Sequence, residues 1–388
     1  MTRPTLLFYC QHSLGMGHLV RSLALAAELA RRCQVVLLNG GPAIPDEGVP
    51  DDVEVVQLPP VGLDEAGQLV SRDHRRGLDR ALALRGRQLL ATFESLHPDV
   101  LLIELFPFGR NKFAGELVPL LDAAQASRRT TIVCSLRDIL VSGLVNQELH
   151  DERASRTANR YFDAVLVHAD PRFATLEESF RPVTPLRIPV HYTGFVVPRR
   201  VVPAQAPHPS RRVLVSVGGG MAGMPLVEAA VDAHALLRPE DGLSMRIIAG
   251  PFYPHDAWRA LRARVLGREG LSLRRQVPDL VLEMRRSLLS VSQCGYNTAL
   301  DLLRAGVPGL VVPFGEGGEN EQRDRARRLE RAGAVRVLEP ARLDPPALAE
   351  AIRSLIRFRP SPVVLDLDGA RWTAEWIAGR PRGHRVVA

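Results

Sequence analysis

The sequence contains a single lysine, Lys112, among 50 basic residues. A phosphate-binding P-loop needs Gly-Lys before Ser or Thr, and Lys112 follows Asn111, which excludes a nucleotide hydrolase of that type. A Schiff-base or pyridoxal enzyme would have to depend on Lys112 alone. The arginines are scattered without interleaved aromatic residues, so the net charge of +7 predicts no nucleic-acid partner.

Cysteines and long apolar runs are also scarce. No zinc-type spacing occurs among the four cysteines, Cys10, Cys33, Cys134 and Cys294, so we expect a reducing, cytoplasmic compartment. The sequence contains no convincing cluster of metal ligands, and we expect neither a metal nor a cofactor. The longest uncharged stretch, residues 4–20, contains Gln11, His12 and His18, which excludes a membrane-spanning helix. Its apolar part, residues 5–10, is too short for a signal peptide.

The chain alternates short apolar strands with longer helical stretches. We predict strands at residues 6–10, 35–39, 53–58, 100–104, 131–135 and 164–167, and then at 213–217, 244–249, 288–292, 309–313 and 335–338. Helices are predicted at residues 19–32, 77–96, 115–127 and 225–237. Apolar strands that alternate with helices are typical of parallel sheets covered on both faces.

Residues 198–212 interrupt this alternation with four prolines and four arginines, a composition that predicts a linker. We therefore predict an α/β protein with two doubly wound, Rossmann-like domains that face a cleft. The expected division is an N-terminal domain at 1–197, the linker at 198–212, a C-terminal domain at 213–360 and a closing helix at 361–388.

The first candidate site is the loop after the first strand, with Gly15, Gly17, His18 and Arg21. Glycines allow close backbone approach to a ligand, and a histidine can accept a proton near neutral pH. The alternative is that the glycines only pack a strand on a helix.

The second candidate is the loop with Gly218, Gly219 and Gly220, which fits the pattern Gly-x-Gly-x-x-Gly. That pattern indicates either a dinucleotide site or backbone amides that bind phosphate at a helix start.

The third candidate lies in residues 294–322 and contains Gly295, Asp301, Glu321 and Gln322. An acid and an amide at helix starts beside the cleft could bind sugar hydroxyls, or could simply be solvated. Glu104, Arg110 and Arg137 follow first-half strands, where they could line an acceptor or form structural salt bridges.

In this order, the motifs Gly-x-Gly-His-x-x-Arg, Gly-Gly-Gly, Ala-Gly-Val-Pro, Val-Pro-Phe and Glu-Gln resemble those of GT-B glycosyltransferases, most closely family 28. The family includes the N-acetylglucosaminyltransferase that completes lipid II. The loop at residues 15–21 is also similar to that of a UDP-sugar hydrolase of nonulosonate synthesis.

The resemblance implies a role for each matching residue. His18 would be the general base, and Gly15, Gly17, Arg21 and Arg137 would lie on the acceptor side. The donor residues would be Gly218, Gly219 and Gly220 at the diphosphate, Val277 at the base, Gly295 and Asp301 near the ribose, and Glu321 and Gln322 at the sugar. This sequence departs from the family at Gly220, Asp301 and Glu321, which replace a hydroxyl residue, a glutamate and a Gln or Asp.

The predicted function is a metal-independent, inverting glycosyltransferase that uses a nucleotide-diphosphate sugar, with UDP-sugars such as UDP-GlcNAc as the first candidates. A UDP-sugar hydrolase, an NAD-binding oxidoreductase and a non-catalytic nucleotide-sugar sensor are the alternatives. The acceptor is a small molecule or lipid-linked, and the basic residues 72–87 could form a rim for peripheral contact with the inner face of a membrane.

Overall fold

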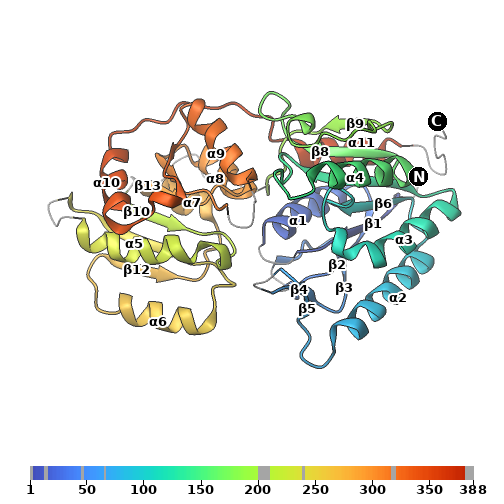
Figure 1. The fold of residues 1–388 in the computed structure, drawn as a ribbon, viewed down its shortest axis with the longest axis horizontal. Coiled ribbons are helices and arrows are strands. Elements are labelled where there is room, and N and C mark those ends of the chain that lie inside the picture. Colours follow the sequence, from blue (N-terminus) through green and yellow to red (C-terminus); the bar gives the residue numbers. More distant parts are fainter. Residues whose placement is uncertain are drawn as a thin grey trace.

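A computed structural model describes residues 3–12, 16–44, 48–64, 67–199, 210–237, 241–315 and 320–380. Two α/β halves lie side by side, each built around its own sheet (Figure 1). The two doubly wound sheets predicted from the sequence are therefore present.

The first half contains a seven-stranded parallel sheet with the order β3-β2-β1-β6-β7-β8-β9. Its strands are β1 Thr5–Cys10, β2 Gln34–Asn39, β3 Val53–Gln57, β6 Val100–Glu104, β7 Thr131–Arg137, β8 Ala164–His168 and β9 Val190–Tyr192. A separate antiparallel hairpin is formed by β4 Val61–Leu63 and β5 Leu69–Ser71.

Helices cover both faces of this sheet. They are α1 Gly17–Leu29, α2 Leu78–Leu96, α3 Ala114–Ser127 and α4 Gln147–Tyr161, with short turns η2 Asn111–Phe113 and η3 Leu176–Glu178. Along β1, Leu7 and Tyr9 pack with α2, α3 and α4, whereas Leu6 and Phe8 face α1 on the opposite side. This alternation follows from the two-residue period of a strand.

The second half contains a six-stranded parallel sheet with the order β12-β11-β10-β13-β14-β15. Its strands are β10 Ser210–Ser216, β11 Ser244–Ile248, β12 Leu271–Arg274, β13 Ser287–Ser292, β14 Gly309–Val311 and β15 Arg336–Val337. The helices are α5 Met224–Leu236, α6 His255–Val265, α7 Leu280–Arg285, α8 Tyr296–Ala305, α9 Glu321–Arg331 and α10 Pro345–Leu355, with turns η4 Met221–Gly223 and η7 Pro340–Arg342.

The last helix, α11 Gly369–Ala378, returns to the first half, where Ala370, Ala374 and Ile377 join the buried cluster beside α1. The predicted closing helix thus packs on the half that begins the chain. β10 begins at Ser210, inside the predicted linker, and residues 200–209 of that linker lie outside the described residues.

Two expectations need correction. The strand predicted at residues 309–313 ends at Val311, and Pro313 has no N–H with which to continue the ladder. The proposed basic rim at residues 72–87 is wrong for Arg85, which is fully buried with its Nε 2.7 Å from Glu116 Oε2. No helix in the described part of the chain has the length and apolar character needed to cross a membrane.

Candidate functional site

Most of the predicted site residues follow the carboxyl ends of the strands in the two sheets. In the first sheet, chain order reverses between β1 and β6, and His18 follows β1 while Glu104 ends β6. In the second sheet the reversal lies between β10 and β13, which are followed by Gly218 and Gly295. Such reversal points are where open α/β sheets bind ligands.

At the first reversal point, His18 and Glu104 form a close pair. Tyr9 of β1 pairs with Ile103 of β6, so that Glu104 lies beside the start of α1. His18 Nδ1 is 2.6 Å from Glu104 Oε1, and the Arg21 Nη2 atom is 2.5 Å from the same oxygen. His18 and Arg21 reach one carboxylate because residues three apart share a helix face.

The surroundings of this pair favour an ionised carboxylate and a neutral imidazole. Burial raises the pKa of Glu104, but His18, Arg21 and Arg110 together hold that pKa below its usual range. Burial lowers the pKa of His18, and Arg110 and Arg21 lower it further, against the opposing effect of Glu104. A neutral His18 that donates its Nδ1–H to Glu104 leaves Nε2 free to accept a proton.

The two partners of this pair differ in their access to solvent. The His18 side chain is 20% exposed, whereas that of Glu104 is fully buried. Arg21 is also buried, with a relative exposure of 1%, and its guanidinium lies against the Glu104 carboxylate. The residue predicted on the acceptor side is thus a partner of Glu104 in this structure.

Gly17, at the start of α1, contacts the second half of the protein. The Asn297 Nδ2 atom in α8 donates to the carbonyl oxygen of Gly17 at 3.1 Å. A Cβ atom on Gly17 would lie 3.7 Å from that amide nitrogen, which is an ordinary contact. Gly15, which the sequence analysis places in the same loop, lies outside the described residues.

At the second reversal point, Gly218 and Gly220 adopt positive φ angles of 56° and 108°. A Cβ atom on Gly220 would lie 2.6 Å from the carbonyl oxygen of Ala249, so the tight turn needs glycine there. The Gly220 N–H already donates to the carbonyl of Val217 at 3.1 Å. The amides of Gly218 and Gly219 are therefore the better candidates for binding phosphate.

Val277, Gly295 and Asp301 lie further along the same edge. Val277 follows β12 and is partly buried against the cluster that includes Ile248 and Met284. Gly295 precedes the first residue of α8 with extended backbone angles. Asp301 is 21% exposed, and its Oδ1 atom is 3.6 Å from Arg304 Nη1.

Glu321 and Gln322 begin α9, where each already has a structural partner. Gln322 Oε1 accepts the backbone N–H groups of Cys294 and Phe314, at 3.1 and 3.2 Å. Arg137 Nη1 is 3.2 Å from Glu321 Oε1. Arg137 therefore contacts the residue predicted at the donor sugar, rather than facing an acceptor alone.

A buried ion pair next to these residues joins the two halves. The Arg325 guanidinium donates to both carboxylate oxygens of Asp138, each at 2.8 Å, and donates to the carbonyl of Cys294 at 2.8 Å. Both side chains of the pair are at most 2% exposed. Ser142 and Asn320 add two further hydrogen bonds across the same boundary.

Comparison with known proteins gives the same fold and a family match for the second half of the chain. Residues 215–363 match the glycosyltransferase family 28 C-terminal domain. Over 358 residues the chain is 27% identical to the UDP-N-acetylglucosamine–N-acetylmuramyl-(pentapeptide) pyrophosphoryl-undecaprenol N-acetylglucosamine transferase of Thiobacillus denitrificans, a match that covers 88% of each protein. The structure resembles MurG of Acinetobacter baumannii with a TM-score of 0.60 and 16% identity, over 97% of this chain and 99% of that one.

The protein is a glycosyltransferase with the GT-B fold, and its second half resembles family 28. A second structural neighbour, the spinosyn rhamnosyltransferase SpnG, has a TM-score of 0.56 and 18% identity over 97% of this chain and 95% of that one. The family resemblance, the fold class and the class of enzyme predicted from the sequence are thereby confirmed.

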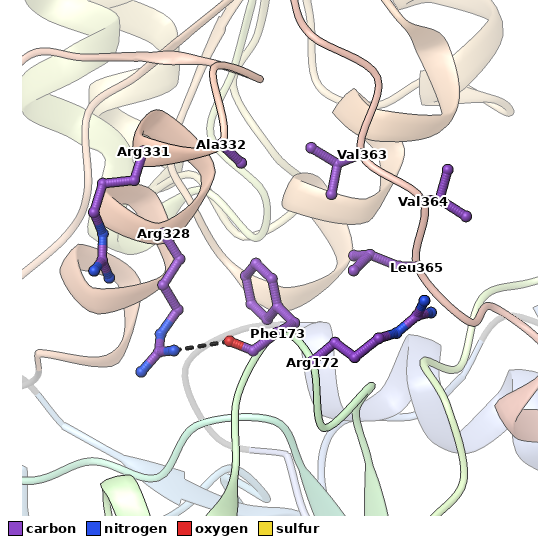
Figure 2. A pocket seen from close by; sticks show the side chains of 8 residues that line it. All are labelled: Arg172, Phe173, Arg328, Arg331, Ala332, Val363, Val364 and Leu365. Atoms are coloured by element: carbon purple, nitrogen blue, oxygen red, sulfur yellow. Dashed lines mark hydrogen bonds between the residues drawn. The ribbon is translucent and has the colours of Figure 1, made fainter.

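This glycosyltransferase also has a cavity of about 430 Å³ that contains none of the predicted site residues. Figure 2 shows it between the loop after β8, the end of α9 and the segment that leads back to the first half. The lining residues are Arg172, Phe173, Arg328, Arg331, Ala332, Val363, Val364 and Leu365. The Arg328 guanidinium donates to the carbonyl of Phe173 there, which ties α9 to the first half.

Several residues at this site have no catalytic or positioning role among the predictions made from the sequence. Glu104 was considered only as an acceptor contact or a salt bridge, although it ends a fully apolar strand. Tyr296 and Asn297 lie inside the third candidate segment, residues 294–322, and no role is predicted for either. In the described residues no group of three or more His, Cys, Asp or Glu side chains is placed to hold a metal ion.

Proposed function

We propose that this protein is an inverting glycosyltransferase that moves a sugar from a UDP-sugar to an acceptor hydroxyl without a metal ion. The observation that carries the proposal is the His18–Glu104 pair, 2.6 Å apart, at the reversal point of the first sheet. The Asn297–Gly17 hydrogen bond brings α8, at the edge of the second sheet, against the same loop. The relative in Thiobacillus denitrificans is named as a UDP-N-acetylglucosamine transferase, so UDP-GlcNAc is the first donor to test.

In the proposed reaction, His18 Nε2 accepts the proton of the acceptor hydroxyl as the oxygen attacks the anomeric carbon. The bond between that carbon and the diphosphate oxygen breaks, and UDP leaves with the bonding electron pair. Glu104 keeps the Nδ1–H tautomer in place and stabilises the imidazolium that forms. Attack on the face opposite the leaving group inverts the configuration of the sugar.

The donor would lie along the edge of the second sheet. The backbone amides of Gly218 and Gly219, next to the start of α5, would stabilise the charge that develops on the diphosphate. Asp301 would bind the ribose and Val277 the base. Because Arg137 already holds one oxygen of Glu321, the second oxygen, which is buried without a hydrogen-bond partner, is the one that could accept from a sugar hydroxyl.

The acceptor would approach from the first half. Large apolar side chains are exposed on the segment after Arg137: Leu144, Val145 and Leu149 are 37%, 94% and 47% exposed. Ser142 of the same segment bonds Asn320, next to Glu321. This placement supports an acceptor with an apolar part, either a small molecule or a lipid carrier, and a comparison of alkylated with unalkylated sugar acceptors tests it.

A thermal-shift titration with UDP, GDP, dTDP and NAD side by side tests the nucleotide part of the proposal. Ligand at a hundred times its dissociation constant adds about 2.7 kcal/mol of stability. We expect UDP to stabilise the protein. We also expect the protein to release UDP from a UDP-sugar only when an acceptor is present, and to do so equally in EDTA. Stabilisation by NAD alone would contradict it, because the glycine loop would then be a dinucleotide site.

UDP-sugar hydrolysis is the second candidate, since the His18–Glu104 pair could activate water equally well. Free sugar formed with UDP at the same rate with and without acceptor would favour the hydrolase. Binding of a UDP-sugar with no release of UDP under any condition would favour a sensor.

A further inference from the structure

Helix α8 belongs to the second sheet, but its first residue is buried in the first half. Tyr296 is 6% exposed and lies in the same buried cluster as Tyr9 and Leu7 of β1. Its hydroxyl group accepts the Val196 N–H at 2.8 Å and donates to the carbonyl of His168 at 3.0 Å. Both hydrogen-bond partners lie in the first half, so they fix the tyrosine ring relative to the first sheet.

The ring of Tyr296 contacts Arg21, which in turn contacts the partner of the proposed general base. The Arg21 guanidinium carbon lies 5.3 Å from the centre of the Tyr296 ring, a cation–π geometry. The Nη2 atom of the same arginine is 2.5 Å from Glu104 Oε1, which also holds His18 Nδ1 at 2.6 Å. One continuous set of contacts thus leads from α8 to the imidazole.

A second contact from α8 reaches the backbone next to His18. The Asn297 Nδ2 atom donates to the carbonyl oxygen of Gly17, the residue immediately before His18, at 3.1 Å. The side chain and the backbone of the proposed base are therefore both held by consecutive residues of the other half. The charged groups that face His18 from the first half are Glu104, Arg21 and Arg110.

We infer that Tyr296 and Asn297 are positioning residues that complete the general base, so that the His18–Glu104 pair is correctly oriented only while α8 lies against the first half. This inference rests on the proposed function, since it concerns the same site. Tyr296 acts through Arg21 and Glu104, and Asn297 acts through the Gly17 carbonyl. Neither needs to touch the substrate, and a displacement of about 1 Å at a base lowers turnover strongly.

The test uses the full-length protein with Tyr296→Leu, Tyr296→Phe and Asn297→Ala. Tyr161→Leu is the matched control, because Tyr161 is also a buried tyrosine whose hydroxyl is hydrogen-bonded, 2.9 Å from Asp122, at the end of α4. Single-turnover UDP release from UDP-GlcNAc, or from the UDP-sugar that stabilises the protein best, gives the rate and the donor affinity. The ¹⁵N chemical shifts of His18, assigned with His18→Gln, give its tautomer at pH 7.5.

We expect Tyr296→Leu and Asn297→Ala each to lower the single-turnover rate by about tenfold or more, with donor affinity changed less than about threefold. Tyr296→Phe keeps the ring over Arg21 and should recover most of the rate. In Tyr296→Leu, the Nδ1–H tautomer of His18 should give way to a mixture. Asn297→Ala removes only a partly exposed amide contact, so it provides the test if Tyr296→Leu does not fold.

The inference is wrong if both variants lose no more rate than Tyr161→Leu, or if they lose donor affinity while the rate and the tautomer stay unchanged. Failure of the proposed function has a different signature. Wild-type protein would then release no UDP from any donor, while the tautomer of His18 would still respond to Tyr296→Leu if the positioning inference is right.

Discussion

Replacement of Glu104 by glutamine removes one charge at the centre of the proposed site and keeps the shape of the side chain. In the wild-type protein a single carboxylate oxygen faces both His18 Nδ1 and Arg21 Nη2, while Arg110 Nε lies 3.9 Å from the other oxygen. A glutamine can place its oxygen atom between His18 and Arg21. Its NH2 group then faces Arg110, and two hydrogen-bond donors meet there without an acceptor. The substitution therefore leaves buried positive charge without compensation.

Two magnitudes follow from this geometry. Removing the acidic partner of a buried ion pair costs about 3–5 kcal/mol, because Arg21 at 1% exposure cannot be solvated where it lies. Loss of the carboxylate that fixes the tautomer of a catalytic histidine lowers turnover by about 10²- to 10⁴-fold. Glu104 raises the pKa of His18, so its removal lowers that pKa further, and raising the pH does not restore the rate.

The assay is single-turnover UDP release between pH 6 and 9, together with thermal unfolding. Glu116→Gln is the control, because Glu116 also forms a buried ion pair in the first half, with Arg85 Nη2 at 2.6 Å, away from His18. The control should lose comparable stability and keep its turnover. If Glu104→Gln kept turnover within about threefold, or if Glu116→Gln lost as much, Glu104 would have no specific part in the reaction.

The remaining predictions concern the ion pair between the halves and the donor edge. Burial raises the pKa of Asp138 but Arg325 lowers it more, so Asp138→Asn should cost about 3–5 kcal/mol of unfolding free energy at pH 7. That difference should shrink as the pH falls below about 4, where Asp138 becomes protonated in the unfolded chain while the folded carboxylate stays ionised to lower pH, and a pH-independent difference would contradict the pairing. Gly220→Ala should weaken UDP binding in calorimetry by about tenfold, because φ is 108° and the new Cβ meets a backbone oxygen, and unchanged affinity would place the diphosphate elsewhere. Asp301→Ala should bind UDP and 2′-deoxy-UDP equally well, and continued discrimination between them would remove Asp301 from the ribose site.

Much of the fold follows from local sequence patterns. The strand at residues 100–104 was predicted with its observed bounds, because its apolar run is preceded by Pro98 and Asp99 and is followed by the charged Glu104 as its last residue. Helix α4 was missed, since its sequence QELHDERASRTANRY has few apolar residues and its burial depends on Ala154, Ala158 and Tyr161 in the folded protein. The edge strand β9 was missed and β15 was predicted one residue too long at each end, because these strands contain only three and two residues.

The site is predictable only in part, because it is assembled by the order of the strands. Glu104 lies 86 residues from His18 in sequence and reaches it because β6, although β2 and β3 precede it in the chain, pairs directly with β1 on the side away from them. The ion pair of Asp138 and Arg325 joins residues 187 apart in two different halves. Local motifs identify the loops, whereas these contacts depend on how two sheets meet, which no single segment encodes.

The most direct test of the account is the His18→Ala variant, measured by single-turnover UDP release and by UDP calorimetry on the same preparation. The account predicts a loss of turnover of about 10²-fold or more with UDP affinity unchanged, because the base lies on the first sheet and the nucleotide on the second. Unchanged turnover, or a loss of UDP binding in place of turnover, would contradict the assignment of His18 as the general base.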